Sequence, residues 1–209
     1  MEKLWIIGHG GHAKVIGEAA SLRQIPVGYI VEEADPEDSA TISEDLFIKT
    51  YATSPGQGLI CGLGTTGSTM VRRRVLERYR SCHEMFVNII HPTAFVSPSA
   101  TLGRGVFVAA NVTLCNGCFV GDHAILNTRS SIDHDCKVGA RCHIAPGTVL
   151  SGGCSVGDDV HIGVGSTLIQ GIEIASSTVV GAGSLVTKKI PVSNFLWHGS
   201  PAKKQRPIE

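Results

Sequence analysis

The chain has 209 residues, of which 43% are hydrophobic and 17% charged, a composition typical of a globular protein with one or two domains. Lys and Arg together number 18, as do Asp and Glu, so the basic excess that a nucleic-acid partner requires is missing. The N-terminus runs directly into Leu4-Trp5-Ile6-Ile7-Gly8 without a charged leader or a long apolar stretch, which argues against secretion and membrane association and favours the cytoplasm.

Alternating strands and helices are predicted for residues 1–90. An apolar strand at 4–8 ends in a glycine-rich turn, and a helical pattern follows to about Arg23. Further strands are expected at 27–31, 59–63 and 85–90, with a basic helix at 67–80. This order predicts a small α/β, Rossmann-like domain with a parallel sheet.

From Val96 onward the pattern changes to a strict period of six. Every sixth residue is aliphatic: Val96, Leu102, Val108, Leu114, Val120, Leu126, Ile132, Val138, Ile144, Leu150, Val156, Ile162, Leu168, Ile174, Val180 and Val186. Such hexads predict an all-β parallel β-helix over residues 91–209, including a C-terminal tail, with three hexads in each triangular coil and about five coils before Ile190. The glycine that often follows the aliphatic residue, as at Gly103 and Gly121, is expected to allow a tight turn.

Cysteines fit the same repeat. Cys118, Cys136, Cys142 and Cys154 occupy the fifth hexad position, where a small buried side chain is expected, so packing is their predicted role. Cys118, Cys136 and Cys154 lie one coil apart, about 4.8 Å, which would allow a disulfide sterically. The odd total of seven cysteines predicts a reducing compartment instead, and the single CxxC pair is weak evidence for a metal.

Several segments combined with the hexads resemble one family. They are Gly8-His9-Gly10-Gly11-His12, His91-Pro92-Thr93-Ala94, Ile132-Asp133-His134-Asp135-Cys136 and Gly199-Ser200-Pro201-Ala202-Lys203. The whole chain resembles the bacterial sugar O- and N-acyltransferases that acetylate nucleotide-linked 4-amino-4,6-dideoxyhexoses or sialic acid. The resemblance implies a left-handed β-helix, a homotrimer, acetyl-CoA bound between neighbouring helices, no metal, and a role in surface glycan (lipopolysaccharide) synthesis.

Acetyl transfer from a thioester requires a base for the attacking amine and a donor for the oxyanion. His134 is the candidate base, and Asp135 or Asp133 is expected to orient its ring. The family has a glutamate after this histidine, whereas this chain has Asp135, which leaves the orienting carboxylate open. The alternative is a solvated Asp-His-Asp turn without a catalytic role.

Coil arithmetic places Gly152 one coil above His134, and the resemblance implies that its N–H holds the thioester carbonyl, although a glycine in a tight turn is the alternative. By resemblance, His143 belongs to the acetyl-CoA site and Asn127 to the active site. His143 lies half a coil from His134, so the two are predicted to face different walls of one chain. His143 and His161, one coil apart, could instead form an exposed polar ladder.

The glycine turn is predicted to bind the nucleotide-linked sugar. Gly8-x-Gly10-x-x-Ala13 with an acidic pair about 20 residues later is a weak dinucleotide fingerprint, but some 90 residues supply only one mononucleotide-binding half. We therefore expect the sugar or pyrophosphate near the turn and the base or ribose near the acidic pair. A purely structural turn is the alternative. The predicted binding residues are Gly8, His9, Gly10, Gly11, His12, Glu32 and Glu33.

Lys188, Lys189 and Lys203 lie beyond the last coils, where they are predicted to meet the phosphates of coenzyme A, unless they are ordinary solvated lysines. Three other functions remain open from the sequence. They are O-acetylation of sialic acid, a β-helix zinc carbonic anhydrase using His134, His143 and His161, and a non-catalytic scaffold.

Overall fold

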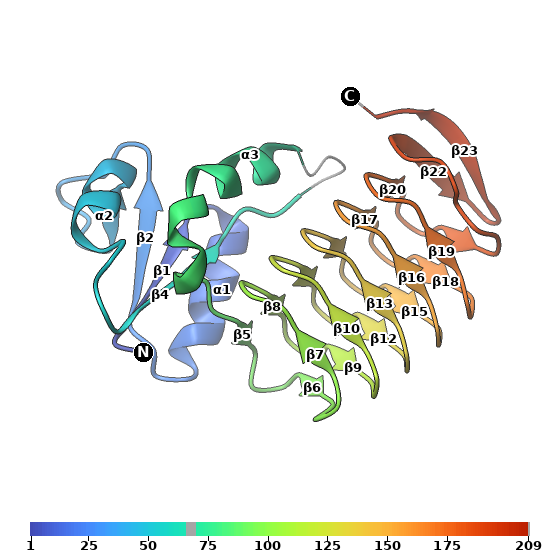
Figure 1. Cartoon of the computed structure of the whole chain (residues 1–209), viewed down its shortest axis with the longest axis horizontal. Helices are drawn as coiled ribbons and strands as arrows, with labels where there is room; N and C mark the ends of the chain where they lie inside the picture. The colour runs from blue at the N-terminus through green and yellow to red at the C-terminus, as the bar shows by residue number, and fades with distance from the viewer. Residues whose placement is uncertain (66–69, 209) are drawn as a thin grey trace.

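The computed structural model describes residues 1–65 and 70–208, and Figure 1 shows a mixed α/β part followed by a stack of coils. The first part contains a four-stranded parallel sheet in the order β3-β2-β1-β4. Its elements are β1 (Lys3–Ile7), α1 (Gly11–Ser21), β2 (Val27–Val31), β3 (Thr41–Ser43), α2 (Glu44–Thr50), β4 (Gln57–Cys61), α3 (Met70–Arg78) and the 3-10 helix η1 (Arg80–Met85).

Alternation along β1 divides the core into two layers. Leu4 and Ile6 pack into the cluster that contains α1, while Trp5 and Ile7 pack on the opposite face into the cluster that contains Phe47 of α2. This is the period of two expected for a strand buried on both faces.

Two expectations for the later segments of this part are met only in part. The basic helix is described only from Met70, because the predicted start at 67–69 lies outside the described residues. The predicted strand at 85–90 is present only in part: 80–85 form η1, Phe86 makes a single parallel bridge with Leu59 of β4, and β5 (Ile89–Ile90) pairs with the β-helix. The short β3 and α2 were not predicted, although Ser43 caps α2 by accepting a hydrogen bond from Leu46 N.

The hexads form the predicted β-helix, with three sheets in which two-residue strands stack in parallel, in about six coils rather than five. A longer antiparallel hairpin ends the largest sheet. The eight-stranded sheet contains β5, β8 (Phe107–Val108), β11 (Ile125–Leu126), β14 (His143–Ile144), β17 (His161–Ile162), β20 (Val179–Val180), β22 (Phe195–Gly199) and β23 (Ala202–Pro207). The six-stranded sheet contains β6 (Phe95–Val96), β9 (Thr113–Leu114), β12 (Ser131–Ile132), β15 (Val149–Leu150), β18 (Thr167–Leu168) and β21 (Leu185–Val186). The five-stranded sheet contains β7 (Thr101–Leu102), β10 (Phe119–Val120), β13 (Lys137–Val138), β16 (Ser155–Val156) and β19 (Glu173–Ile174).

The glycines beside the aliphatic column have a different role from the one predicted. Positive φ recurs every six residues from 105 to 183, three positions after the aliphatic residue, and never at Gly103 or Gly121. A Cβ on Gly121 would lie 2.6 Å from Ala140 N in the next coil. These glycines therefore let successive coils approach each other, while the left-handed turn lies elsewhere.

Packing of the fifth-position cysteines is confirmed. Cys118, Cys136, Cys142 and Cys154 are buried, and each thiol donates to a carbonyl fifteen residues later, as Cys142 Sγ does to Gly157 O at 2.9 Å. All seven cysteines are free.

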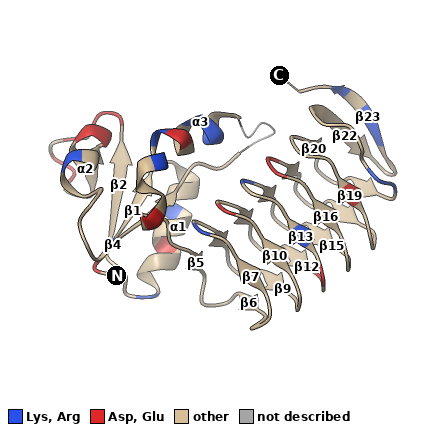
Figure 2. Cartoon of the chain, in the orientation of Figure 1, with Lys and Arg blue, Asp and Glu red and all other residues tan. Residues whose placement is uncertain are grey.

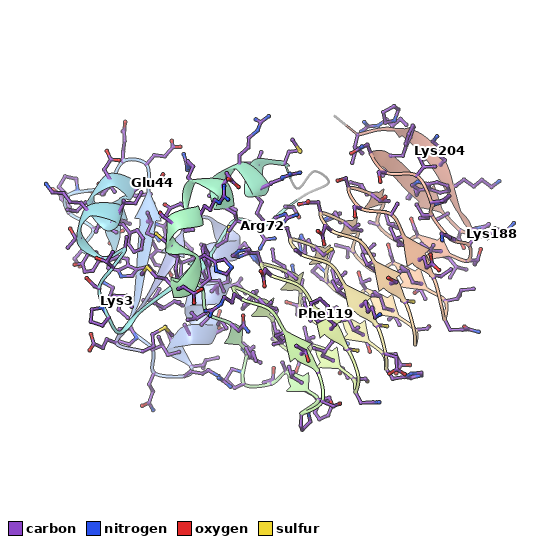
Figure 3. The ribbon with its side chains drawn as sticks, viewed as in Figure 1. Lys3, Glu44, Arg72, Phe119, Lys188 and Lys204 are labelled. Atoms are coloured by element: carbon purple, nitrogen blue, oxygen red, sulfur yellow. The ribbon has the colours of Figure 1, made fainter. Side chains whose placement is uncertain are left out.

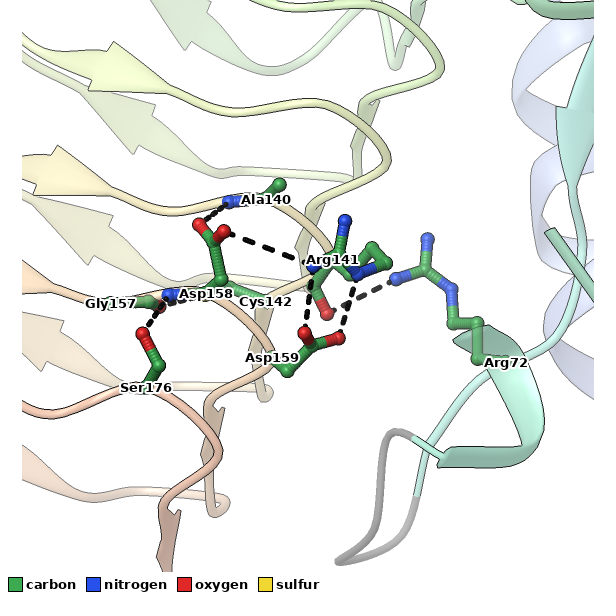
Figure 4. A network of polar contacts seen from close by, with 8 residues as sticks. All are labelled: Arg72, Ala140, Arg141, Cys142, Gly157, Asp158, Asp159 and Ser176. Carbon is green, nitrogen blue, oxygen red and sulfur yellow. Dashed lines mark hydrogen bonds and ion pairs between the residues drawn. The ribbon is translucent and has the colours of Figure 1, made fainter. Parts of the chain in front are cut away.

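The α/β part and the β-helix share one hydrophobic core, which joins Leu4 and Ile16 to Ile89 and Val106. Arg72 of α3 reinforces this contact: its side chain is buried and donates to the carbonyls of His123 and Arg141 at two successive coil turns. Arg141 in turn makes a bidentate ion pair with Asp159 at 2.8 and 2.7 Å (Figure 4). No helix in 1–65 or 70–208 is long and apolar enough to span a bilayer.

Candidate active site

His134 lies on the turn between β12 and β13, at the corner of the six- and five-stranded sheets. Its Nδ1 is 2.8 Å from Asp135 Oδ2, whereas Asp133 Oδ1 accepts from the His134 backbone N–H at 2.8 Å. The structure thus places Asp135, not Asp133, against the ring. Because the carboxylate can only accept, Nδ1 carries the proton and Nε2 of the neutral ring has a free lone pair.

Glycines in the coils on either side make room for this pair. A Cβ on Gly152 would lie 2.5 Å from His134 Nε2, and a Cβ on Gly117 would lie 2.5 Å from Asp135 Oδ1. Gly153 N donates to His134 O at 2.9 Å, so Gly152 lies one coil above His134, as coil arithmetic predicted. In the described part of the chain the Gly152 N–H has no acceptor.

The carboxylates raise the pKa of His134 above its ordinary value of 6.5, first through the hydrogen bond to Asp135 and then through the charge of Asp133. The side chain is largely exposed, at 55%. A solvated imidazole with one fixed nitrogen and one free nitrogen is suited to moving a proton near neutral pH.

His143 lies in a different setting, on β14 of the eight-stranded sheet, and is buried. Its Nδ1 is 3.0 Å from the carbonyl oxygen and 2.9 Å from the hydroxyl of Thr65, and its Nε2 is 3.0 Å from Asn127 Nδ2. Both ring nitrogens are therefore occupied within the protein. Burial, His161 and His12 lower the pKa of His143 to about 3, so the ring is neutral at physiological pH.

The expected stacking of His161 on His143 is confirmed by pairing of β14 with β17, and the ring centroids are 5.0 Å apart. The alternative of an exposed ladder is wrong, because both rings are more than nine-tenths buried. Asn127 contacts His143 and makes no hydrogen bond with His134 in the described part of the chain. Thr65, which follows β4 in the chain, contacts the side chains of both His143 and His161.

The glycine turn lies at the carboxyl end of β1, where β1 and β4 are neighbours and their connections leave in different directions. Gly8 has φ +91, and a Cβ on Gly10 or Gly11 would meet no atom within 4 Å. Gly10 caps α1 without a side-chain hydrogen bond. The backbone here is open to a ligand, at the kind of crevice where open parallel sheets bind ligands.

A cavity of about 380 Å³ lies beside this turn, at the ends of β1, β2 and β4. Gly8, Glu32, Leu63 and Arg78 are among its lining residues, while Glu33 is exposed on the next turn. His9 packs on Tyr29 with ring centroids 4.3 Å apart.

His12 belongs to the same turn, and its ring faces the β-helix. It packs edge-on against Phe107 at 5.5 Å and approaches His143 at 6.3 Å. Burial lowers its pKa to about 4, and Nε2 is buried without a hydrogen-bond partner in the described structure.

The basic residues of the C-terminal region lie far along the stack, on and before the β22–β23 hairpin (Figure 2). Lys188 and Lys203 are exposed, while Lys189 forms an ion pair with Glu173. Across the described residues, no group of three or more His, Cys, Asp or Glu side chains is arranged to hold a metal ion. His134 in particular is not grouped with His143 and His161.

Comparison with known proteins gives one family match and three similar proteins. Residues 117–152 match the family model "Bacterial transferase hexapeptide (six repeats)". The structure of perosamine N-acetyltransferase from Caulobacter crescentus with CoA and GDP-perosamine is 36% identical, with a TM-score of 0.86 over 99% of this chain and 98% of that one. The chain belongs to the hexapeptide-repeat family of sugar O- and N-acyltransferases.

Two further proteins are similar to this chain. The acetyltransferase domain of PglB from Neisseria gonorrhoeae FA1090, in complex with acetyl coenzyme A, is 30% identical with a TM-score of 0.87, over 98% of this chain and 99% of that one. UDP-N-acetylbacillosamine N-acetyltransferase of Bacillus subtilis (strain 168) is 30% identical over 123 residues, which are 53% of this chain. The match spans only about half, 52%, of that relative.

Sequence reasoning missed three residues of the acyltransferase site region. Gly117 was detectable, because it lies one coil before Asp135 just as Gly152 lies one coil after His134. Thr65 and Arg72 gave no signal, since their contacts join segments 51 to 78 residues apart.

Proposed function

We propose that this protein transfers the acetyl group of acetyl-CoA to the 4-amino group of a nucleotide-linked 4-amino-4,6-dideoxyhexose. The observation that carries the proposal is the His134–Asp135 pair, whose free Nε2 faces the backbone of Gly152. A base and an unoccupied N–H donor thus lie together at one corner of the β-helix.

The chemistry follows from these groups. Nε2 of His134 takes a proton as the amine nitrogen attacks the thioester carbonyl, and Asp135 stabilises the imidazolium. The Gly152 N–H donates to the oxyanion of the tetrahedral intermediate. When that intermediate collapses, the C–S bond breaks, the amide remains, and the sulfur leaves as the thiol of CoA with the proton held by His134. Asn127 is kept as a site residue on the family resemblance, and its amide contacts His143.

The acceptor is assigned to the crevice beside the glycine turn. Gly10 and Gly11 offer bare backbone at the start of α1, which suits a pyrophosphate, and Glu32 lines the adjoining cavity, where it can accept from a ribose or base. The similar Caulobacter crescentus structure is described as holding GDP-perosamine and CoA, which supports a nucleotide-linked amino sugar as the acceptor class here.

Finer features of the proposal rest on the family resemblance. We infer a left-handed β-helix, a cytoplasmic homotrimer that acts in surface glycan synthesis, domain limits at 1–90 and 91–209, and CoA phosphates near Lys188 and Lys203. Phe95 (57% exposed) and Phe119 (47% exposed) lie on strands of the coil walls, which supports burial against other copies. Phe119 is labelled in Figure 3. Sedimentation of the active protein should give about three times 22.0 kDa. Full activity in a monomer would contradict the trimer.

The test of function is free-thiol release from acetyl-CoA in the presence of UDP-, dTDP- and GDP-linked 4-amino sugars, with sialic acid as a further acceptor. Thiol release with a nucleotide-linked amino sugar and none with sialic acid is expected. Release with sialic acid alone would overturn the proposal, as would the absence of release with every acceptor.

A further inference from the structure

A second cavity, of about 450 Å³, lies on the eight-stranded sheet, away from the nucleotide-site cavity. Its lining repeats from coil to coil in three columns: His143, His161 and Val179; Ala145, Gly163 and Gly181; and Pro146, Val164 and Ala182. Thr65 lies at its edge. The cavity is thus a trough along the helix axis that spans three coils, about 10 Å at the usual strand spacing.

The trough has an apolar wall with few polar groups. His143 contributes no free polar atom, because Thr65 and Asn127 occupy both its nitrogens. Gly163 and Gly181 add no side chain to this wall, and a Cβ on Gly163 would lie 2.5 Å from Ala182 N in the next coil. Such a shape suits a narrow, extended and mostly apolar ligand.

The hydrogen bonds at its edge have fixed directions. Asn127 Oδ1 accepts from Thr128 N at 2.8 Å, so the Asn127 amide donates to His143 Nε2. The carbonyl of Thr65 can only accept, so His143 Nδ1 carries the proton and donates to Thr65. Two independent partners therefore specify the same tautomer of His143.

The chain continues through the hydroxyl of Thr65, which already receives His143 Nδ1–H and lies 3.4 Å from His161 Nδ1. Among the described residues, that nitrogen is the one acceptor available for the hydroxyl proton of Thr65. Accepting it makes Nδ1 of neutral His161 the unprotonated nitrogen. The proton of His161 is then on Nε2, for which the described residues offer no hydrogen-bond partner, and the His161 side chain lines the trough.

We propose that His161 is a binding residue for the acetyl donor, with its Nε2–H donating to an amide carbonyl of the pantetheine arm of CoA in this trough, and that Thr65 is the positioning residue that fixes this tautomer. The inference rests on the proposed function, since it takes the acetyl donor as the ligand. Burial lowers the pKa of His161, which keeps the ring neutral and suited to this role.

The ligand class follows from the shape and the donor. The pantetheine arm is an extended chain with two amide groups, so it needs an apolar trough and an occasional hydrogen-bond donor. The nucleotide part of CoA has neither property. The trough therefore fits the pantetheine arm, and the phosphates of CoA are expected to bind at a more exposed surface.

A first experiment tests the tautomer without any ligand. In the ¹⁵N-labelled full-length protein, the histidine nitrogen shifts should show Nδ1–H for His143 and Nε2–H for His161. Thr65→Val, which removes the hydroxyl and keeps the carbonyl, should leave His143 unchanged and mix the tautomers of His161, whereas Thr65→Ser should retain the wild-type signals. Nδ1–H on His161 in the wild type would overturn the proposal.

A second experiment measures the dissociation constants of CoA and of 3′,5′-ADP, which lacks the arm. His161→Leu should weaken CoA binding about 3- to 10-fold, the range for losing one neutral hydrogen bond, and leave 3′,5′-ADP unchanged. Thr65→Val should act in the same direction. His83→Leu is the matched control, because His83 is a half-exposed histidine of η1 that lines neither of the two cavities described above. Thermal unfolding checks that each variant is folded.

The outcomes separate the two proposals. Wild-type protein that binds CoA, together with His161→Leu and Thr65→Val variants that bind it equally well, sinks the role of His161 and leaves the transferase function standing. Wild-type protein that does not bind CoA overturns the proposed function and this inference together. Equal weakening of CoA and 3′,5′-ADP would place His161 away from the arm and also count against it.

Discussion

At the scale of single residues, the same side chain has opposite properties in two places. His134 is exposed beside two carboxylates, which raise its pKa, whereas His143 is enclosed among neutral partners and its pKa falls to about 3. Only the first ring exchanges a proton readily near neutral pH. His143 is therefore not suited to act as the base, because its lone pair already accepts from Asn127.

Replacing His134 tests this assignment. His134→Ala should lower kcat by about 10² to 10⁴, the usual contribution of a general base, with little change in CoA affinity. Asp135→Asn should lower kcat by a smaller factor. Its effect on kcat should nearly vanish in the His134→Ala background, because His134 and Asp135 act as a unit. Steady-state kinetics of the four proteins measure this, with His83→Leu as the control.

The pH profile gives a separate check on the pair. Protonation removes the free lone pair of His134, so kcat/KM should fall on the acid side through an ionisation above 6.5. Asp135→Asn removes the largest cause of the raised pKa and should move that limb to lower pH. An acid limb unaffected by Asp135→Asn would show that another group titrates.

Gly152 tests the room above the ring. Its φ is not in the left-handed region, so Gly152→Ala introduces no backbone strain, but the new Cβ would lie 2.5 Å from His134 Nε2. We expect a kcat loss comparable to that of His134→Ala, with Ser151→Ala near wild type. The contact with the ring should also lower the free energy of unfolding of Gly152→Ala. This loss should disappear when Gly152→Ala is combined with His134→Ala, because the ring that the methyl group meets is then absent. No recovery would mean that the methyl group meets another obstacle.

At the scale of elements, the β-helix was predictable because each coil buries one aliphatic residue per wall. This requirement gives the sequence an unbroken period of six. The turns were less visible. Their left-handed positions hold Gly105 and Asn111 but also His123, Arg129 and Ser177, so no residue type marks them. Hydrogen bonds along the stack, such as Arg129 N to Ala110 O, hold these residues there.

The α/β part was predicted only in outline, for a similar reason. The strand–turn–helix at its start follows from an apolar run and glycines, whereas β3 and α2 are three and seven residues long and too short for a periodic signal. In the site, His134 and Gly152 were found because one repeat relates them. Thr65 and His12 contact the eight-stranded sheet of the β-helix through tertiary packing between distant segments. A local sequence pattern does not predict such contacts.

Gly11 tests the role of the turn before α1. A Cβ at this position meets no atom within 4 Å, so Gly11→Val should leave the fold intact while blocking approach of a ligand to the helix start. The KM for the nucleotide-linked sugar should rise with the CoA dissociation constant nearly unchanged. Equal loss of affinity for both ligands would indicate a folding defect and not a binding role.

At the scale of the whole molecule, the contact between the α/β part and the β-helix contains several histidines that are buried and neutral. Burial lowers the pKa of His12 and His123 to about 4 and that of His143 to about 3, in each case helped by the charge of nearby Arg72. Arg72 donates to the carbonyl of His123 and supplies a fixed positive charge at the same place. A second charge here is unfavourable.

Stability should therefore depend on pH in the mildly acid range. In the unfolded chain these histidines bind protons below about pH 6.5, whereas in the folded chain they do not bind protons until pH 3 to 4. Their contribution to the free energy of unfolding is therefore fully present above pH 6.5 and is lost as the pH falls through that range. Each group contributes at most about 1.4 kcal/mol per pH unit. Urea unfolding at fixed protein concentration should show this between pH 7.5 and 5.5.

A variant isolates one of these groups. His123→Asn keeps a residue that tolerates positive φ but does not titrate, so its slope of stability against pH should be shallower than that of the wild type. A free energy of unfolding that is flat from pH 7.5 to 5.5 in the wild type would contradict the expectation.

The uniform stacking of the coils also restricts how the length of this molecule changes. Pairing such as Phe119 with Lys137 and Lys137 with Ser155 returns each wall after eighteen residues, so an insertion or deletion of any other length rotates every later side chain to the wrong place. Only whole coils can be gained or lost after His134 without scrambling the walls. The separation between the reacting corner and the basic hairpin at the far end is therefore quantised, in steps of about 4.8 Å.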